Sequence, residues 1–160
     1  MTSAREKGQA PAPLLAPHEP PPYQIENREG RAPLLFACDH ASWAVPECLR
    51  NLGLQPSDLQ QHIGWDPGAA QATIRLARRF GAPAIMTQYS RLVIDYNRAP
   101  RTAASIPEVS DHTRIPGNTG LSPSEVARRE DTLFKPYHAA ITDLLDNIRE
   151  SGATPIYIAV

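Results

Sequence analysis

Short, continuous apolar runs alternate along the chain with longer segments of helical spacing. The runs at 33–38, 83–88 and 154–160 are apolar at consecutive positions, which is typical of strands buried on both faces of a sheet. A further apolar run, 91–96, follows the second run after only two residues. We expect it to form a third strand, antiparallel to its predecessor or continuing it through a bend, because two residues cannot make a parallel crossover.

Two longer segments have the spacing and the end signals of helices. The first is predicted to begin at Asp66, an N-cap residue followed by a proline, and to end at Gly81. The second begins at Ser122 with a capping box and keeps helical spacing as far as Gly152. Pro136 removes one backbone donor inside this second segment and should bend or split the helix.

The order of these elements predicts the fold class. A strand, helix, strand, strand, long helix and strand indicate a layered α/β/α domain with a mixed, largely parallel sheet. Ligands bind such sheets at the carboxyl ends of the strands. The last predicted strand runs to Val160, and we expect the domain to be incomplete at its C-terminus.

The first 30 residues differ in composition from the rest of the chain. They contain six prolines and few branched or aromatic side chains. Such a segment can bury little apolar surface, so residues 1–30 are predicted to form a disordered or extended arm. We expect the folded domain to occupy residues 31–160.

The charge balance narrows the class of partner. Sixteen basic residues nearly balance 17 acidic ones, which gives no long-range field to attract nucleic acid or a membrane surface. A small solute is the expected partner. The sequence shows no apolar run typical of a secretory signal or a membrane span, so we expect a cytoplasmic protein.

His40 is the first candidate for chemistry. It follows the apolar run 33–38 and precedes small residues, so it should lie at the carboxyl end of a strand. An imidazole there can bind a divalent metal ion, or it can cap the strand end by hydrogen bonds alone. Asp66 and Glu47 are candidate carboxylate ligands, although Asp66 also has its structural explanation as an N-cap. The pattern leaves both alternatives open.

The segment 90–101 brings a second group of polar residues together. It contains Asp95, Asn97 and two arginines, Arg91 and Arg98. A guanidinium group can bind a carboxylate through two parallel hydrogen bonds, so the segment suggests an anionic substrate. An ion pair between Asp95 and an arginine that orders the loop explains the pattern equally well.

Five segments in a fixed order carry a resemblance to one protein family. The sequence resembles the N-formylglutamate amidohydrolase family, and the resemblance covers the chain from about residue 33 to the end. The matching segments are CDHASWAVP, HIGWDPGAA, YSRLVIDYNRAP, SIPEVSDHTRIPGNTGL and PYHAAI.

The resemblance implies a fold, a reaction and roles for several residues. It implies a phosphorylase/hydrolase-like α/β fold of the zinc-dependent exopeptidase type, and hydrolysis of the formamide bond of N-formyl-L-glutamate to formate and glutamate. His40 then matches the first histidine that binds Zn²⁺, and Asp66 matches a carboxylate ligand. DYNR is similar to the Asp-x-Asn-Arg element of aspartoacylase-type deacylases, which implies that Asn97 and Arg98 hold the substrate carboxylate. Arg91 is a third candidate for that contact.

Two features of the family have no match in this sequence. The segment that supplies a further histidine and the acidic residue suited to general-base work are both missing, so no catalytic base can be named. One interpretation is therefore a metal-dependent hydrolase of a small anionic N-acyl amino acid, or the N-terminal part of one. A second is a catalytically incomplete fragment or a non-enzymatic binding module that self-associates through an unfinished sheet. A third keeps the deacylase but changes the acyl group.

Overall fold

The central sheet contains four strands in the order β1-β3-β2-β6, in a computed structural model that describes residues 12–160. The strands are β1 (Tyr23–Glu26), β2 (Leu34–Cys38), β3 (Ala84–Thr87) and β6 (Ile156–Ala159). Strand β2 runs parallel to both β3 and β6, whereas β1 runs antiparallel to β3. The prediction of a mixed, largely parallel sheet is confirmed.

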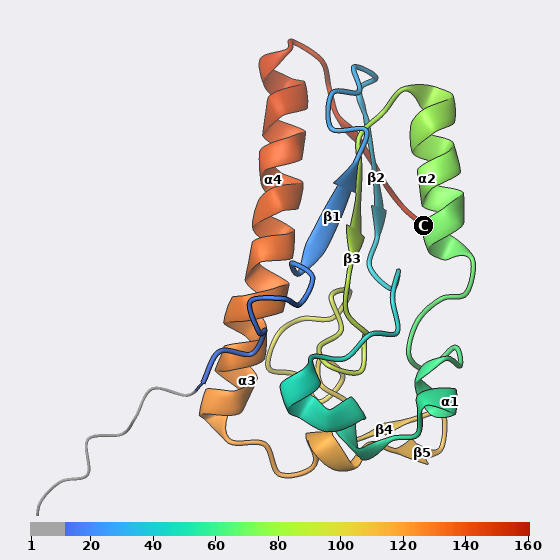
Figure 1. Cartoon of the computed structure of the whole chain (residues 1–160). Helices are drawn as coiled ribbons and strands as arrows, with labels where there is room; N and C mark the ends of the chain where they lie inside the picture. Colours follow the sequence, from blue (N-terminus) through green and yellow to red (C-terminus); the bar gives the residue numbers. More distant parts are fainter. Residues whose placement is uncertain (1–11) are drawn as a thin grey trace, which may run out of the picture.

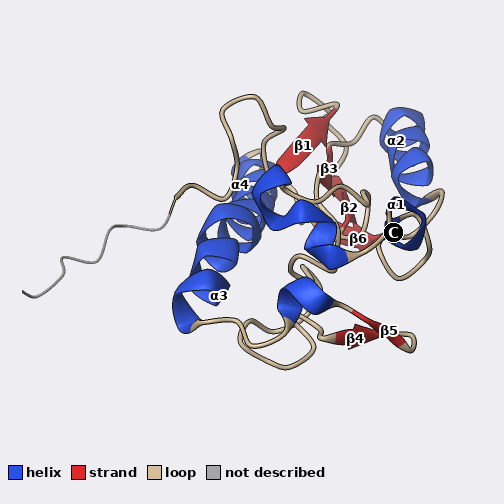
Figure 2. Ribbon diagram, turned by 60° about the horizontal axis from the view of Figure 1, so that its bottom comes forward, coloured by secondary structure: helices blue, strands red, loops and turns tan. Residues whose placement is uncertain are grey.

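Helices cover both faces of this sheet. Helix α4 (Lys135–Glu150) lies on one face, and α2 (Ala69–Phe80) packs on β2 and β3 from the other (Figure 1). The view in Figure 2, turned by 60°, shows the same order of helix, sheet and helix. Strands β2 and β3 are apolar at almost every position because both of their faces lie under helices. Helix α2 ends at Gly81, which has a φ of 63° as expected for a glycine C-cap.

The long second helix is divided, as Pro136 suggested. It consists of α3 (Pro123–Arg129), a π-helical turn η3 (Glu130–Phe134) and α4. Ser122 caps α3 by accepting a hydrogen bond from the backbone N–H of Glu125. Pro136 lies in the first turn of α4, where its missing N–H disrupts no bond within that helix.

Short elements occupy the ends of the layers. They are the 3₁₀ helices η1 (Glu47–Gly53) and η2 (Pro116–Asn118), helix α1 (Pro56–Leu59), and a two-stranded ribbon formed by β4 (Val109–Ser110) and β5 (Thr113–Arg114). No helix among residues 12–160 is long and apolar enough to cross a membrane.

The predicted strand at 91–96 is wrong. The segment forms turns, in which the side chain of Ser90 accepts a hydrogen bond from the N–H of Leu92, and the N–H of Val93 bonds to the carbonyl of Ser90. Its apolar side chains are nevertheless almost fully buried in the main core. Burial explains the apolar run, and the run therefore resembles a strand without being one.

The predicted arm at residues 1–30 is also wrong over its described part. Strand β1 belongs to the sheet, and Leu14 is only 1% exposed in the main core. The prolines leave backbone carbonyls available as acceptors: Tyr89 donates its hydroxyl to Pro20, and the N–H of Gln88 bonds to Pro22. This segment is held by hydrogen bonds to β3 and the residues after it, which its own composition cannot reveal. Residues 1–11 lie outside the described residues.

Candidate functional site

The candidate residues meet beyond the carboxyl ends of β2 and β3. His40 comes two residues after the end of β2, and the segment that contains Asp95 follows β3. Asp66 precedes α2, and its backbone N–H donates to the carbonyl of His40 over 2.9 Å. The fold therefore joins three separate stretches of sequence at the edge of the sheet where ligands of parallel sheets bind.

His40 lies between two carboxylates. Its Nδ1 is 3.2 Å from Oδ2 of Asp66, and its Nε2 is 2.9 Å from Oδ1 of Asp95. The residue is only 8% exposed. A neutral imidazole has one N–H group, so it can donate to one carboxylate and present a lone pair toward the other.

Asp95 is the most heavily bonded group of the site. It is 4% exposed, and besides His40 it accepts hydrogen bonds from the backbone N–H of Asn97 and from a terminal nitrogen of Arg91. The Nε atom of Arg98 lies 4.0 Å from its Oδ2. Burial acts to raise the pKa of Asp95, but the hydrogen bond to His40, the Asn97 N–H and the neighbouring cations outweigh it, and the pKa is lowered. Asp95 is therefore held as a carboxylate.

Asp66 is more open and does not have the structural role predicted for it. Gly68, with a φ of 89°, is the N-cap of α2, so the prediction of Asp66 as the cap is wrong. The side chain of Asp66 is 47% exposed and turns toward His40 and Arg91, with its Oδ1 atom 3.5 Å from the Arg91 guanidinium. The backbone carbonyl of Asp66 still accepts a bond from Ala69 at the helix start. The side chain is therefore available to the site.

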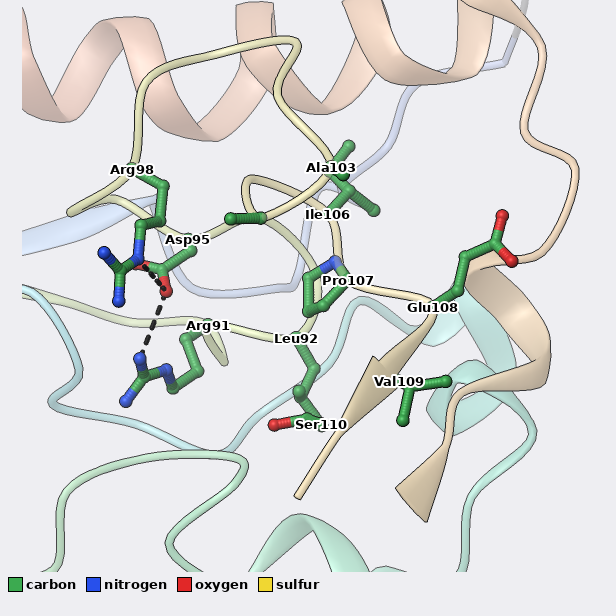
Figure 3. Close-up of a pocket in the computed structure, with 11 residues that line it drawn as sticks. Arg91, Leu92, Asp95, Arg98, Ala103, Ile106, Pro107, Glu108, Val109 and Ser110 are labelled. Carbon is green, nitrogen blue, oxygen red and sulfur yellow. Dashed lines mark hydrogen bonds and ion pairs between the residues drawn. The ribbon is translucent and has the colours of Figure 1, made fainter. Parts of the chain in front are cut away.

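The two arginines line one cavity, which Asp95, a partner of His40, also borders. A cavity of about 690 Å³ is bordered at one end by Arg91, Asp95 and Arg98 (Figure 3). Arg91 bridges Asp66 and Asp95, which confirms the ion pair considered from the sequence. Asn97 is exposed, and it is its backbone N–H that bonds to Asp95. The structure thus brings Arg91 and Arg98 together, while binding of a substrate by either arginine or by Asn97 stays a prediction.

The donor atoms near His40 match part of a zinc site. His40 Nδ1 and Asp66 Oδ2 converge, and both are common zinc ligands, whereas Asp95 holds the far side of the ring. Glu47 pairs with His18 instead. Within residues 12–160 no group of three His, Cys, Asp or Glu side chains is arranged to hold a metal ion. A catalytic zinc usually has three protein ligands, so these residues fit a part of its coordination sphere.

A known protein family matches most of the sequence. The model of the N-formylglutamate amidohydrolase family matches residues 32–160. The chain belongs to this family. An N-formylglutamate deformylase of Pseudomonas putida is 28% identical over 132 residues, which cover 76% of this chain and 48% of that protein.

Two solved structures are similar to this member of the N-formylglutamate amidohydrolase family. Gene product Atu2144 from Agrobacterium tumefaciens has a TM-score of 0.89 and 29% identity, over 91% of this chain and 58% of that one. An N-formylglutamate amidohydrolase from Ralstonia eutropha JMP134 has a TM-score of 0.59 and 22% identity, over 86% and 55%. The second likeness concerns the fold alone. The chain spans about half the length of these relatives.

Proposed function

We propose that this chain provides the site of an amide hydrolase that cleaves N-formyl-L-glutamate, or a similar N-acyl amino acid, into a carboxylic acid and the free amino acid. The observation that carries the proposal is His40, held between Asp66 and Asp95, of which Asp95 also lines a cavity with Arg91 and Arg98. Membership of the N-formylglutamate amidohydrolase family supports it. His40 and Asp66 are residue types that bind metal ions, and the guanidinium of Arg98 can bind an anionic substrate.

We assign the metal to Zn²⁺, held by Nδ1 of His40 and a carboxylate oxygen of Asp66. When bound, the ion supplies polarisation of the amide carbonyl and a lowered pKa for a water molecule. The role of Asp95 is to accept the Nε2–H of His40, which fixes the tautomer and turns the Nδ1 lone pair toward Asp66. We also propose that the fold is of the zinc-dependent exopeptidase type and that the protein is cytoplasmic.

The remaining side chains bind and orient. Arg98 has a half-exposed guanidinium at the cavity and can hold the substrate carboxylate through two hydrogen bonds. Arg91 keeps Asp66 and Asp95 in place on either side of the imidazole. The predicted role of Asn97 is to donate its exposed side-chain amide to the same carboxylate. Among the described residues we assign none as the general base.

A second candidate function is a binding module that keeps the sheet of the family without turnover. Strand β6 lies at an edge of the sheet, and Ile156, Tyr157 and Val160 are exposed there. An exposed apolar edge strand can pair with another chain. In this alternative the chain binds a ligand or self-associates through β6, and it releases no product.

Formate release from N-formyl-L-glutamate by the zinc-loaded 160-residue chain tests the first proposal. We expect turnover and one bound zinc ion per chain, and both should be lost in His40→Ala. The matched control is His62→Ala, because His62 is an exposed histidine that pairs with Asp111. His40→Asn and circular dichroism separate loss of the ligand from loss of the fold. Turnover that survives in His40→Ala contradicts the metal assignment, whereas binding without turnover favours the second function.

A further inference from the structure

The contact between His40 and Asp95 joins two segments that lie outside the strands and helices. His40 comes two residues after the end of β2, and Asp95 lies in the turns at 91–96 that follow β3. The two side chains meet at 2.9 Å although 55 residues separate them in the sequence. A hydrogen bond between two irregular segments keeps its length only where other parts of the fold hold both segments. The side chains that hold them therefore have a bearing on the site.

The backbone on either side of His40 is held by one hydroxyl group. Thr87 is the last residue of β3 and is 2% exposed. Its hydroxyl donates to the carbonyl of Asp39 over 3.0 Å and accepts the N–H of Ala41 at 3.3 Å. A threonine hydroxyl has one proton and two lone pairs, so it can make both bonds together. Thr87 thus fixes the residue before His40 and the residue after it.

The turn that carries Asp95 is held from helix α4. The Nε2 atom of His138 is 3.0 Å from the carbonyl oxygen of Tyr96, the residue that follows Asp95. A carbonyl can only accept, so His138 carries a proton on Nε2. The ring centroids of His138 and Phe134 lie 4.2 Å apart, and the ring of Tyr137 meets His138 edge-on at 5.4 Å. This packing keeps the N–H group of His138 directed at the turn.

We propose that Thr87 and His138 are positioning residues for the metal-binding histidine. Thr87 holds the segment of His40, and His138 holds the segment of Asp95. Together they set the distance between the imidazole and the carboxylate, which keeps the proton of His40 on Nε2 and the Nδ1 lone pair free. The inference rests on the proposed function, because this tautomer matters through the metal ion that Nδ1 is proposed to hold.

Thr87→Val tests the first of these contacts, because valine has the shape of threonine and lacks the hydroxyl. In the zinc-free 160-residue chain, nitrogen NMR of the His40 ring should show the single Nε2–H tautomer in the wild type and a mixture of tautomers in Thr87→Val. Zinc affinity, measured against a competing chelator, should fall at least fivefold. Thr87→Ser keeps the hydroxyl and should restore both quantities.

The matched control for this variant is Thr73→Val. Thr73 is also a buried threonine, but its hydroxyl donates within α2, to the carbonyl of Ala69. We expect Thr73→Val to keep the wild-type tautomer of His40 and the wild-type zinc affinity. A single Nε2–H tautomer with unchanged zinc affinity in Thr87→Val, or equal losses in Thr87→Val and Thr87→Ser, would overturn the proposal.

His138 gives a second test, which does not depend on the folding of Thr87→Val. His138→Leu removes the donor to Tyr96 and should weaken zinc binding at least threefold, whereas His138→Gln keeps an N–H donor and should stay within twofold of the wild type. A double-mutant cycle with Asp95→Asn shows whether His138 acts through Asp95. We expect no further loss from His138→Leu in the Asp95→Asn background. An equal loss in both backgrounds means that His138 only stabilises the fold, which contradicts the proposal.

The two proposals can fail separately, because the tautomer of His40 is measured without zinc and without substrate. If the wild type neither binds zinc nor releases formate, the proposed function fails, and a changed tautomer in Thr87→Val still establishes the positioning role. If Thr87→Val and His138→Leu keep the wild-type tautomer, zinc affinity and formate release, the positioning role fails and the proposed function stands.

Discussion

Two buried polar clusters meet at the turns 91–96, where Asp95 belongs to one and Val93 to the other, and they have opposite character. His40 is bonded to two carboxylates, and one of them, Asp95, lines a cavity. Arg129 is 1% exposed, and its guanidinium donates to neutral oxygens, namely the carbonyls of Val93 and Gly117 and the side chain of Asn118. Both clusters join loops to the layers of the fold. Only the first reaches a cavity, which Arg91, Asp95 and Arg98 line.

The difference teaches how to separate a scaffold from a site. Burial lowers the pKa of Arg129 to about 10, so it remains charged at neutral pH. The acceptors that it contacts lie in the turns at 91–96 and in the 3₁₀ helix η2, and it fixes both segments. Asp95 also fixes a loop, through Asn97, but its remaining bonds orient His40 and Arg91. Burial alone does not identify function. The direction in which the bonded groups face does.

The largest effect, on the free energy of unfolding, is expected in the cluster around Arg129. Arg129→Met should lower the free energy of unfolding by about 3–5 kcal/mol, because it leaves buried carbonyls and the Asn118 side chain without a donor. Urea denaturation measures this. Arg149→Ala is the control, since Arg149 makes an exposed pair with Asp146, and a change within about 0.5 kcal/mol is expected. Similar losses in both variants would remove the distinction between the clusters.

The next largest effect is expected on zinc affinity, in the cluster around His40. Asp95→Asn should weaken zinc binding by about 10–100-fold, because the amide no longer holds the Nε2–H of His40 as a carboxylate does. Zinc titration against a competing chelator measures the affinity. Asp111→Asn, at an exposed aspartate that pairs with His62, should leave it unchanged. Unaltered zinc affinity in Asp95→Asn would show that Asp95 serves only the loop.

A third, smaller effect lies where the N-terminal segment meets the core. Tyr89→Phe removes the hydrogen bond to Pro20 and should cost about 1 kcal/mol at pH 7. Burial raises the pKa of Tyr89 to about 12 in the folded chain. Its stabilising contribution is therefore complete below its unfolded pKa of about 10 and is lost as the pH rises toward 12. Unfolding followed between pH 9 and 12 should be less pH-dependent in the variant than in the wild type.

The smallest effect on stability is expected at Asp66. Because Gly68 is the N-cap, Asp66→Ala should change the free energy of unfolding by no more than about 0.5 kcal/mol, although it removes a proposed zinc ligand. Thermal unfolding and zinc titration of the same variant separate the two quantities. A loss of about 1–2 kcal/mol would restore the capping role.

Local patterns predicted most of the layers. Strands β2, β3 and β6, the end of α2 at Gly81 and the cap at Ser122 depend on spacing and end signals within a few residues. The turns at 91–96 were missed because burial in the main core makes an irregular segment as apolar as a strand. Strand β1 was missed because its stability comes from pairing with β3, far along the chain.

The candidate site was predictable only in part, for the same reason. His40 was placed at a strand end from the pattern, and the family resemblance added Asp66. The contact between His40 and Asp95 spans 55 residues, and no local spacing indicates it. The motif DYNR gave the available signal, since it marked Asp95 without showing which partner it faces.

The π-helical turn η3 sets the rotational phase between the two halves of the long helical segment. Its bond from the N–H of Lys135 to the carbonyl of Glu130 encloses one residue more than an α-helical turn does. Each residue adds about 100° around a helix axis. Arg129 before the turn faces the loop carbonyls, while Tyr137 after it donates to Asp39, the neighbour of His40. A chain with one residue fewer there could keep one of these orientations, but not both.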